Sequence, residues 1–149
     1  MKWKTHLMFG LFVGLFLMYF ISITNRFVYL ILISIGSLLP DVDHPKSKIG
    51  NLARPFSYLF EHRGFFHSIF PLIAFYFLIK FNFIIFFPLG MGYVSHIIID
   101  MATKQGILLI HPIINIRISG VIRTGKKLEL LIFYLLVFSN FLLALGLFG

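Results

Sequence analysis

Six histidines and five acidic residues are the side chains of this sequence that could hold a metal, because the chain contains no cysteine. Imidazole nitrogens and carboxylate oxygens bind divalent cations such as Zn²⁺, Mn²⁺ and Fe²⁺. His96 and Asp100 are four residues apart, a spacing that places both on one face of a helix and suits two ligands to one metal. The alternative for this pair is a hydrogen bond that locks two helices together.

Two aspartates and a histidine lie together in residues 39–45, Leu-Pro-Asp-Val-Asp-His-Pro. Asp41 and Asp43 could reach one metal or bridge two, and the two prolines stiffen the segment. One aspartate here would be typical of an ordinary polar turn or a helix cap. Both aspartates together with His44 favour a metal site.

Further candidates lie where a polar stretch enters an apolar run. His62 and His67 are five residues apart, so they do not share a helix face, and we expect a helix to begin near Gly64 with His62 folded back over the same pocket. Arg63 suits an anionic group such as phosphate, because its guanidinium donates two parallel hydrogen bonds. Its alternative role is contact with lipid headgroups. Ser68 could assist in substrate binding.

Three remaining candidates carry weaker signals. His6 opens the first apolar run, where a lone histidine is typical of the membrane interface, but it lies at the same expected membrane face as the others. Glu129 has a simpler explanation, because an acid near a helix N-terminus is stabilised by the helix dipole. His111 suits an interfacial segment.

Composition identifies the elements that must position these residues. Hydrophobic residues make up 59% of the chain and charged residues only 12%, against roughly 25% charged in an average soluble domain. This predicts an all-α integral membrane protein, a single transmembrane helical domain over residues 1–149. The apolar runs are residues 7–23, 27–39, 65–79, 83–101 and 128–148. They predict five spans, or four if the short second run does not cross, with the first run retained as a helix rather than removed as a signal peptide. The patch at residues 107–116 is too short to span and predicts an interfacial or re-entrant segment.

The basic residues predict the orientation of this bundle. Five crossings place the N-terminus and the loops at 41–64 and 104–127 on one side, which then holds eleven of the thirteen Lys and Arg residues. The other side holds Arg26 and Lys80. The positive-inside rule therefore predicts that the N-terminus and the metal site face the cytoplasm from the plasma (inner) membrane. The net charge of +8 is explained by topology and by anionic lipid, with no nucleic-acid partner.

The ordered set of motifs resembles the predicted membrane-bound metal-dependent hydrolases, the YdjM-like inner-membrane family. The matching pieces are Thr5-His6 with Gly10, Leu39-Pro40-Asp41-Val42-Asp43-His44-Pro45 with Ser47 and Gly50, His62-Arg63-Gly64 with His67-Ser68, Gly92 with Ser95-His96 and Asp100, Gly106 with Pro112, and Glu129. Together they span nearly the whole chain.

This resemblance implies a metal site and hydrolysis. The ligands it implies are His6, Asp41, Asp43, His62, His67, His96 and Asp100. The family is distantly similar to zinc-dependent phospholipase C and P1-type nucleases, which cleave phosphate esters at clustered zinc ions. Those soluble enzymes use a processed N-terminal tryptophan as a ligand, whereas Trp3 here follows Met1 and Lys2.

The leading functional hypothesis is metal-assisted hydrolysis of a phosphate ester in a membrane lipid or lipid-linked substrate. One or two ions, zinc foremost with manganese or iron as alternatives, would activate water. Asp43 or Asp41 could act as the base, and Arg63 would hold the phosphate with the help of Ser68. The alternatives are a non-catalytic metal-binding membrane protein, either a scaffold or a small ion carrier, and a structural protein with a metal-free polar network. Peptide hydrolysis lacks support, because no His-Glu-x-x-His pattern occurs.

Overall fold

Helices dominate the part of the chain that the structure describes. The computed structural model describes residues 1–43 and 65–149, except for the side chains of Val42 and Asp43. Five α-helices lie in these ranges: α1 (Trp3–Leu17), α2 (Arg26–Gly36), α4 (Ile69–Phe81), α5 (Phe83–Met101) and α6 (Lys127–Phe148). The 3-10 turns η1 (Leu39–Asp43) and η2 (Phe65–His67) and the strands β1 (Ile107–Leu108) and β2 (Arg117–Ile118) accompany them. The prediction of a mostly helical chain is confirmed.

Short polar side chains set the ends of the middle helices. The hydroxyl oxygen of Ser68 accepts from the N–H of Phe70 at 3.3 Å, and the side-chain oxygen of Asn82 accepts from the N–H of Ile85 at 3.2 Å. Each satisfies a backbone donor that has no partner in the first turn of a helix. Asn82 also ends α4, so a single residue separates α4 from α5.

Several helix boundaries differ from the sequence prediction, most clearly those of α1 and α4. The apolar pattern predicts a first helix over residues 7–23, but α1 begins at Trp3 and ends at Leu17, because Thr5 and His6 are buried and extend the helix through polar positions. The third run begins as a 3-10 turn, and α4 starts only at Ile69, after its cap. The prediction that this helix begins near Gly64 with His67 one turn inside it is therefore wrong, since His67 ends η2.

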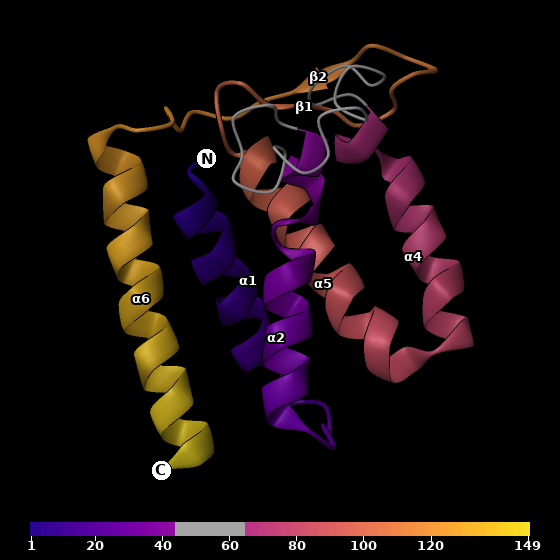
Figure 1. Cartoon of the computed structure of the whole chain (residues 1–149). Helices are drawn as coiled ribbons and strands as arrows, with labels where there is room; N and C mark the ends of the chain where they lie inside the picture. Colours follow the sequence, from indigo (N-terminus) through magenta and orange to yellow (C-terminus); the bar gives the residue numbers. More distant parts are fainter. Residues whose placement is uncertain (44–64) are drawn as a thin grey trace.

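Helix α5 lies in the middle of the bundle and contacts α1, α2 and α4, while α6 packs against α1. Successive helices run in alternating directions (Figure 1). The first turns of α1, α4 and α6 therefore lie at the same end of the molecule as the last turns of α2 and α5. The strands β1 and β2 lie across this end, which we call the polar end.

Small residues allow three helices to approach closely beneath the polar end. A Cβ atom on Gly92 of α5 would collide with the carbonyl oxygen of Ile33 of α2, and one on Gly36 of α2 would collide with the backbone of α5. A Cβ atom on Gly10 of α1 would lie 2.5 Å from Cβ of Ser37. Such contacts are typical of helices that pack in lipid, where backbones meet through small residues.

A short hairpin forms at residues 107–118, where the sequence predicts an interfacial or re-entrant segment over residues 107–116. Ile107 pairs with Ile118 in antiparallel register. Ile107 is fully buried and packs with Tyr93 and Ile97 of α5. The hairpin therefore covers the end of the central helix and does not enter the bundle as a helix.

Two of the described helices are long and apolar enough to cross a membrane, α5 and α6. Half of the apolar window of α5 is buried inside the molecule, at 50%, whereas only 6% of the corresponding window of α6 is buried. The helices α1, α2 and α4 are shorter, at 15, 11 and 13 residues, against roughly 20 residues for a full crossing. The exposed surface of α6 after Lys127 is mostly apolar.

Candidate metal centre

Histidine and aspartate side chains from separate elements meet at the polar end. The residues that converge are His6 from α1, Asp41 from η1, His67 from η2, and His96 and Asp100 from α5. They form two groups that share His96, and within each group one donor atom of every residue lies within 4.8 Å of the others. Five of the seven ligands implied by the family resemblance are therefore brought together. We call these five residues the cluster.

Asp100, on the last turn of α5, contacts three of the imidazoles. Its Oδ1 atom lies 3.4 Å from Nε2 of His6, and its Oδ2 atom lies 3.8 Å from Nε2 of His67 and 3.9 Å from Nε2 of His96. The amino nitrogen of Met1 lies 2.7 Å from Oδ1. Asp100 is fully buried, and a buried carboxylate is stable only where hydrogen-bond donors or cations surround it. The cluster is therefore an environment that favours positive charge.

The backbone of α2 determines which nitrogen of His96 faces the cluster. Nδ1 of His96 lies 2.7 Å from the carbonyl oxygen of Ser37, just after α2. A carbonyl oxygen only accepts, so Nδ1 must carry the proton and Nε2 keeps its lone pair toward the carboxylates. The ring of His6 stacks on that of His96, with centroids 3.7 Å apart. The hydrogen bond from Nδ1 of His96 to a carbonyl is typical of metal-ligating histidines, whose second nitrogen donates to a carbonyl or carboxylate.

Asp41 and His67 complete the other side of the cluster. Oδ1 of Asp41 lies 3.7 Å from Nε2 of His96 and 3.9 Å from Nε2 of His67. The Asp41 side chain is 22% exposed, whereas the side chains of His67 and His96 are 0% exposed. Asp41 is thus the one residue of the cluster with substantial exposure.

Contacts of η2 hold His67 in this position. The hydroxyl of Tyr93 on α5 donates to the carbonyl of Phe66. The N–H of Ile69 donates to the carbonyl of Leu109, after β1, at 2.8 Å. The turn that carries His67 is therefore attached both to the central helix and to the hairpin.

The distances within the cluster suit a cation between the donors. Nitrogen–oxygen separations of 3.4–3.9 Å exceed the roughly 2.7–3.2 Å of a hydrogen bond. Two ligands at about 2.1 Å from a tetrahedral metal lie about 3.4 Å apart. The donor set, imidazole nitrogens with carboxylate oxygens, is also the one that zinc, manganese and ferrous iron accept. These residues therefore fit a divalent cation.

The remaining predicted site residues lie elsewhere or are not described. The candidates outside the described side chains are Asp43, His44, His62 and Arg63, so their predicted roles as ligand, base or phosphate-binding group stay predictions. Ser68 is buried, and its hydroxyl donates to the carbonyl of Phe65 at 2.6 Å while it caps α4. Its part in substrate binding also stays a prediction. His111 lies in the hairpin loop, where its ring contacts the Asn115 side chain at 3.0 Å.

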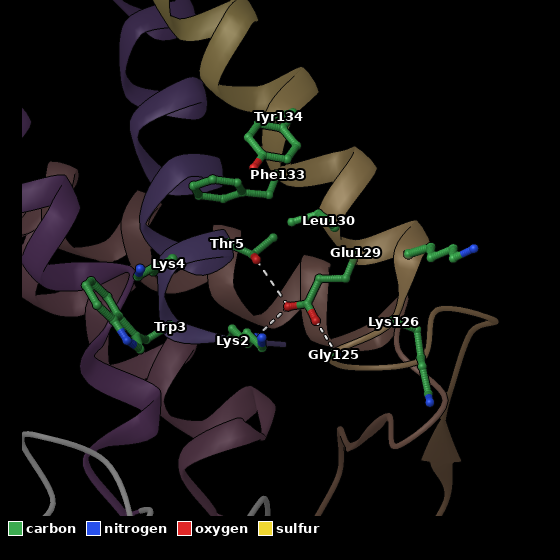
Figure 2. A pocket seen from close by; sticks show the side chains of 11 residues that line it. Lys2, Trp3, Lys4, Thr5, Gly125, Lys126, Glu129, Leu130, Phe133 and Tyr134 are labelled. Atoms are coloured by element: carbon green, nitrogen blue, oxygen red, sulfur yellow. Dashed lines mark hydrogen bonds between the residues drawn. The ribbon is translucent and has the colours of Figure 1, made fainter.

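Glu129 joins two helices beside the cluster (Figure 2). It is buried on the first turn of α6, and Oε1 accepts from the N–H of Lys2 at 2.6 Å and from the hydroxyl of Thr5 at 3.1 Å. Oε2 accepts from the N–H of Gly125 at 2.5 Å, whose φ of +78° is readily adopted only by glycine. The sequence analysis predicted that Glu129 is stabilised near a helix N-terminus, and its hydrogen bond from Gly125, just before α6, agrees with this prediction. The contacts that join α6 to α1 were not predicted.

Two contacts that position the site were not predicted from the sequence. The Ser37 carbonyl that orients His96 is a backbone group, so its residue type carries no signal. The pairing of Glu129 with Thr5 crosses most of the chain. The only available signal was that Thr5 directly precedes His6 within an otherwise apolar helix.

Comparisons with known proteins agree with the resemblance seen in the motifs. The family model described as "YdjM inner membrane protein" matches residues 1–148. The protein named "Inner membrane protein YdjM" from Escherichia coli (strain K12) is 41% identical over 88 residues, 50% of this chain and 44% of that protein. A protein of the same name from Shigella flexneri matches equally. YvsG from Bacillus subtilis (strain 168) is 32% identical over 111 residues, 66% of this chain and 67% of that protein.

The sequence matches to individual proteins cover only part of each protein. The matched region spans less than half the length of the two YdjM proteins. No solved structure matches the chain closely. The family match, however, covers the cluster, the glycines beneath it and every described helix. The chain belongs to the YdjM inner membrane protein family.

Proposed function

We propose that this chain is a metal-dependent membrane hydrolase that cleaves a phosphate ester of a lipid or lipid-linked substrate. The observation that carries the proposal is the cluster itself. Three imidazoles and two carboxylates from four elements lie at separations suited to shared ligation, at the end of an apolar bundle. Two donor groups that share His96 also allow one or two ions.

The residues of the cluster would have different roles in binding the metal and the substrate. His96 presents Nε2 because its Nδ1 is held by the Ser37 carbonyl. His6 and Asp100 lie on the buried side, and Asp41, partly exposed, borders the side on which a substrate would approach. A divalent cation bound there would supply a Lewis acid and a water whose pKa is lowered to about 7.

The residues beyond the described side chains retain their proposed parts. Asp43 would act as a base or a ligand, His62 as a ligand, and Arg63 would hold the phosphate with two parallel hydrogen bonds. In the hydrolysis, water adds a hydroxyl to phosphorus, the phosphorus–oxygen ester bond breaks, and the leaving alcohol takes the proton. An Asp carboxylate near the attacking water is suited to relay that proton.

We also propose five crossings of the inner membrane with the cluster facing the cytoplasm. Two observations support this topology. The helices alternate in direction (Figure 1). Among the described basic residues, Arg26 and Lys80 lie toward the opposite end, and the others lie at or beside the polar end: Lys2, Lys4, Lys104, Arg117, Arg123, Lys126 and Lys127. The bias satisfies the positive-inside rule.

The test is turnover by the full chain in vesicles. Vesicles would contain phosphatidylglycerol, phosphatidylethanolamine and phosphatidic acid, with zinc, manganese or ferrous iron added after chelator treatment. We expect release of phosphate or of a phosphorylated headgroup that depends on metal, and loss of this release to background in His67→Ala/His96→Ala. His111→Ala, a histidine in the hairpin loop, is the matched control and should retain activity. Turnover that survives the double substitution would remove the proposal.

A second candidate, a non-catalytic metal-binding protein, is favoured by one observation. The cluster histidines are at most 1% exposed, and closed metal sites are typical of structural roles. This candidate predicts that metal binds and raises stability, while none of the three lipids is hydrolysed under any metal. The vesicle assay run beside metal analysis separates the two.

A further inference from the structure

A separate pocket lies between the beginnings of α1 and α6 (Figure 2). It has a volume of about 620 Å³. Lys2 and Lys4 line it from the α1 side, and Lys126 and Lys127 line it from the α6 side. All four lysines are exposed, so their long side chains can reach a bound group without being desolvated. Four exposed lysines that line one pocket give it a positive charge, which attracts an anion.

The wall of this pocket that belongs to α6 is apolar. Leu130, Phe133 and Tyr134 line it, and Leu130 and Tyr134 are 54% and 60% exposed. The same exposed surface continues along α6, of which only 6% is buried within the molecule. The pocket therefore joins a basic rim to an apolar surface long enough for acyl chains. A soluble anion would use the rim alone, whereas a phospholipid would use both parts.

The pocket is distinct from the cluster although the two are close. Thr5 and His6 are consecutive in α1, but Thr5 contacts Glu129 at the pocket while His6 contacts Asp100 in the cluster. Glu129 is the acidic residue that lines the pocket. Its two oxygens already accept three hydrogen bonds and face the beginnings of two helices, which carry partial positive charge. Its charge is thus compensated locally, and the lysines remain available.

We propose that this pocket binds the headgroup of an anionic phospholipid, with the phosphate among the four lysines and the acyl chains along the apolar face of α6. Phosphate is a group that lysine binds well as a point charge. Basic residues at a membrane face draw anionic lipids, each adding about 1 kcal/mol near the surface. The inference goes beyond the proposed hydrolysis. It requires no metal, and the bound lipid is a resident ligand, not a substrate.

The single tryptophan of the chain reports on this pocket directly. Trp3 lines the pocket, and the chain has no other tryptophan. The full chain in neutral detergent would be titrated with phosphatidylglycerol brominated on its acyl chains, and with phosphatidylcholine brominated in the same way. We expect Trp3 fluorescence to be quenched at a roughly tenfold or greater lower mole fraction of the anionic lipid, and more weakly at high salt. Inorganic phosphate at the same concentration should not displace the lipid.

Substitution of lysine pairs tests the assignment. Lys126→Ala/Lys127→Ala should weaken quenching by phosphatidylglycerol roughly 10- to 30-fold, and Lys2→Ala/Lys4→Ala should do likewise. Both pairs are exposed, and loss of positive charge at a helix beginning favours the helix, so the fold should persist. Lys104→Ala, at the same polar end but outside the pocket, is the matched control.

Several results would overturn the proposal. They are equal quenching by both lipids, affinity unchanged in both lysine pairs, and displacement of the lipid by inorganic phosphate, which would indicate a site for free anions. The titration is repeated with a chelator present. Lipid binding that persists there without any hydrolytic activity supports this inference even if the proposed hydrolysis fails, so the two failures are distinguishable.

Discussion

The two sides of the first turns of α1 carry side chains that attract ions of opposite charge. On the His6 side, the three imidazoles are buried, and the Asp100 carboxylate has no exposure. On the Lys2 side, lysines stand exposed around an open pocket (Figure 2). The difference in side-chain burial explains which kind of ion each side attracts. A buried carboxylate needs a cation or donors to compensate lost hydration, whereas an exposed ammonium group attracts anions while it keeps its water.

The proposed cation site and the proposed lipid site therefore lie on opposite sides of one helix end. Its position is set from both sides, by the contact of His6 with Asp100 at 3.4 Å and by the contact of Thr5 with Glu129 at 3.1 Å. If the two sides act independently, substitutions on one side should leave the other side's ligand unaffected. The following predictions test that separation.

The largest effect is expected from the ligands on the buried side. Asp100→Asn and His96→Ala should each lower affinity for zinc by more than 100-fold, since outer partners of metal sites alone are worth about 10- to 100-fold. Competition with a chromophoric chelator measures the affinity. Quenching of Trp3 by anionic phospholipid should not change. Zinc affinity equal to wild type in both variants would mean that these residues are not ligands.

The next effect concerns the close approach of α2 and α5. Gly92→Ala places a Cβ atom against the Ile33 carbonyl, so it should lower the free energy of unfolding by about 1–3 kcal/mol and weaken zinc binding, because His96 moves away from the Ser37 carbonyl. Gly90→Ala is the matched control on the same helix, since its Cβ atom would meet Phe75 at an ordinary 3.4 Å. Equal stability of the two variants in mixed-micelle unfolding would refute the packing argument.

A smaller effect is expected where α6 joins α1. Glu129→Ala leaves the donors on Lys2, Thr5 and Gly125 without their acceptor and should cost about 1–3 kcal/mol of unfolding free energy. Thr5→Val removes one of these hydrogen bonds and should cost about 1 kcal/mol. Leu131→Ala, on an exposed position of α6, serves as the control. A Thr5→Val loss as large as that of Glu129→Ala would show that the carboxylate has a different partner.

The fold was predictable where local signals were strong. The residues of α5 were predicted with the observed bounds because Asn82 precedes a long, mostly apolar run, and α6 differs by one residue at its start. The start of α4 was misplaced, since Phe65 and Phe66 extend the apolar run toward the N-terminus until the Ser68 cap is considered. The hairpin at residues 107–118 lacks alternating polarity because Ile107 is buried and the loop is apolar, so periodicity could not identify it.

The cluster was predictable for a different reason. In an apolar chain, His67, His96 and Asp100 are costly unless they meet, and the alternating directions of the described helices place them at one end. Their exact partners were not predictable, because the orientation of His96 depends on a backbone carbonyl. The roles of Met1 and Glu129 likewise depend on contacts between the two ends of the sequence.

Metal content of the purified chain tests the central claim most directly. The full chain would be extracted in neutral detergent, incubated with zinc, manganese or ferrous iron, dialysed against metal-free buffer, and analysed for metal and protein together. We predict one or two equivalents of a divalent cation, and less than one tenth of that content in His67→Ala/His96→Ala. Wild-type protein that retains no metal under any of the three conditions would contradict the account.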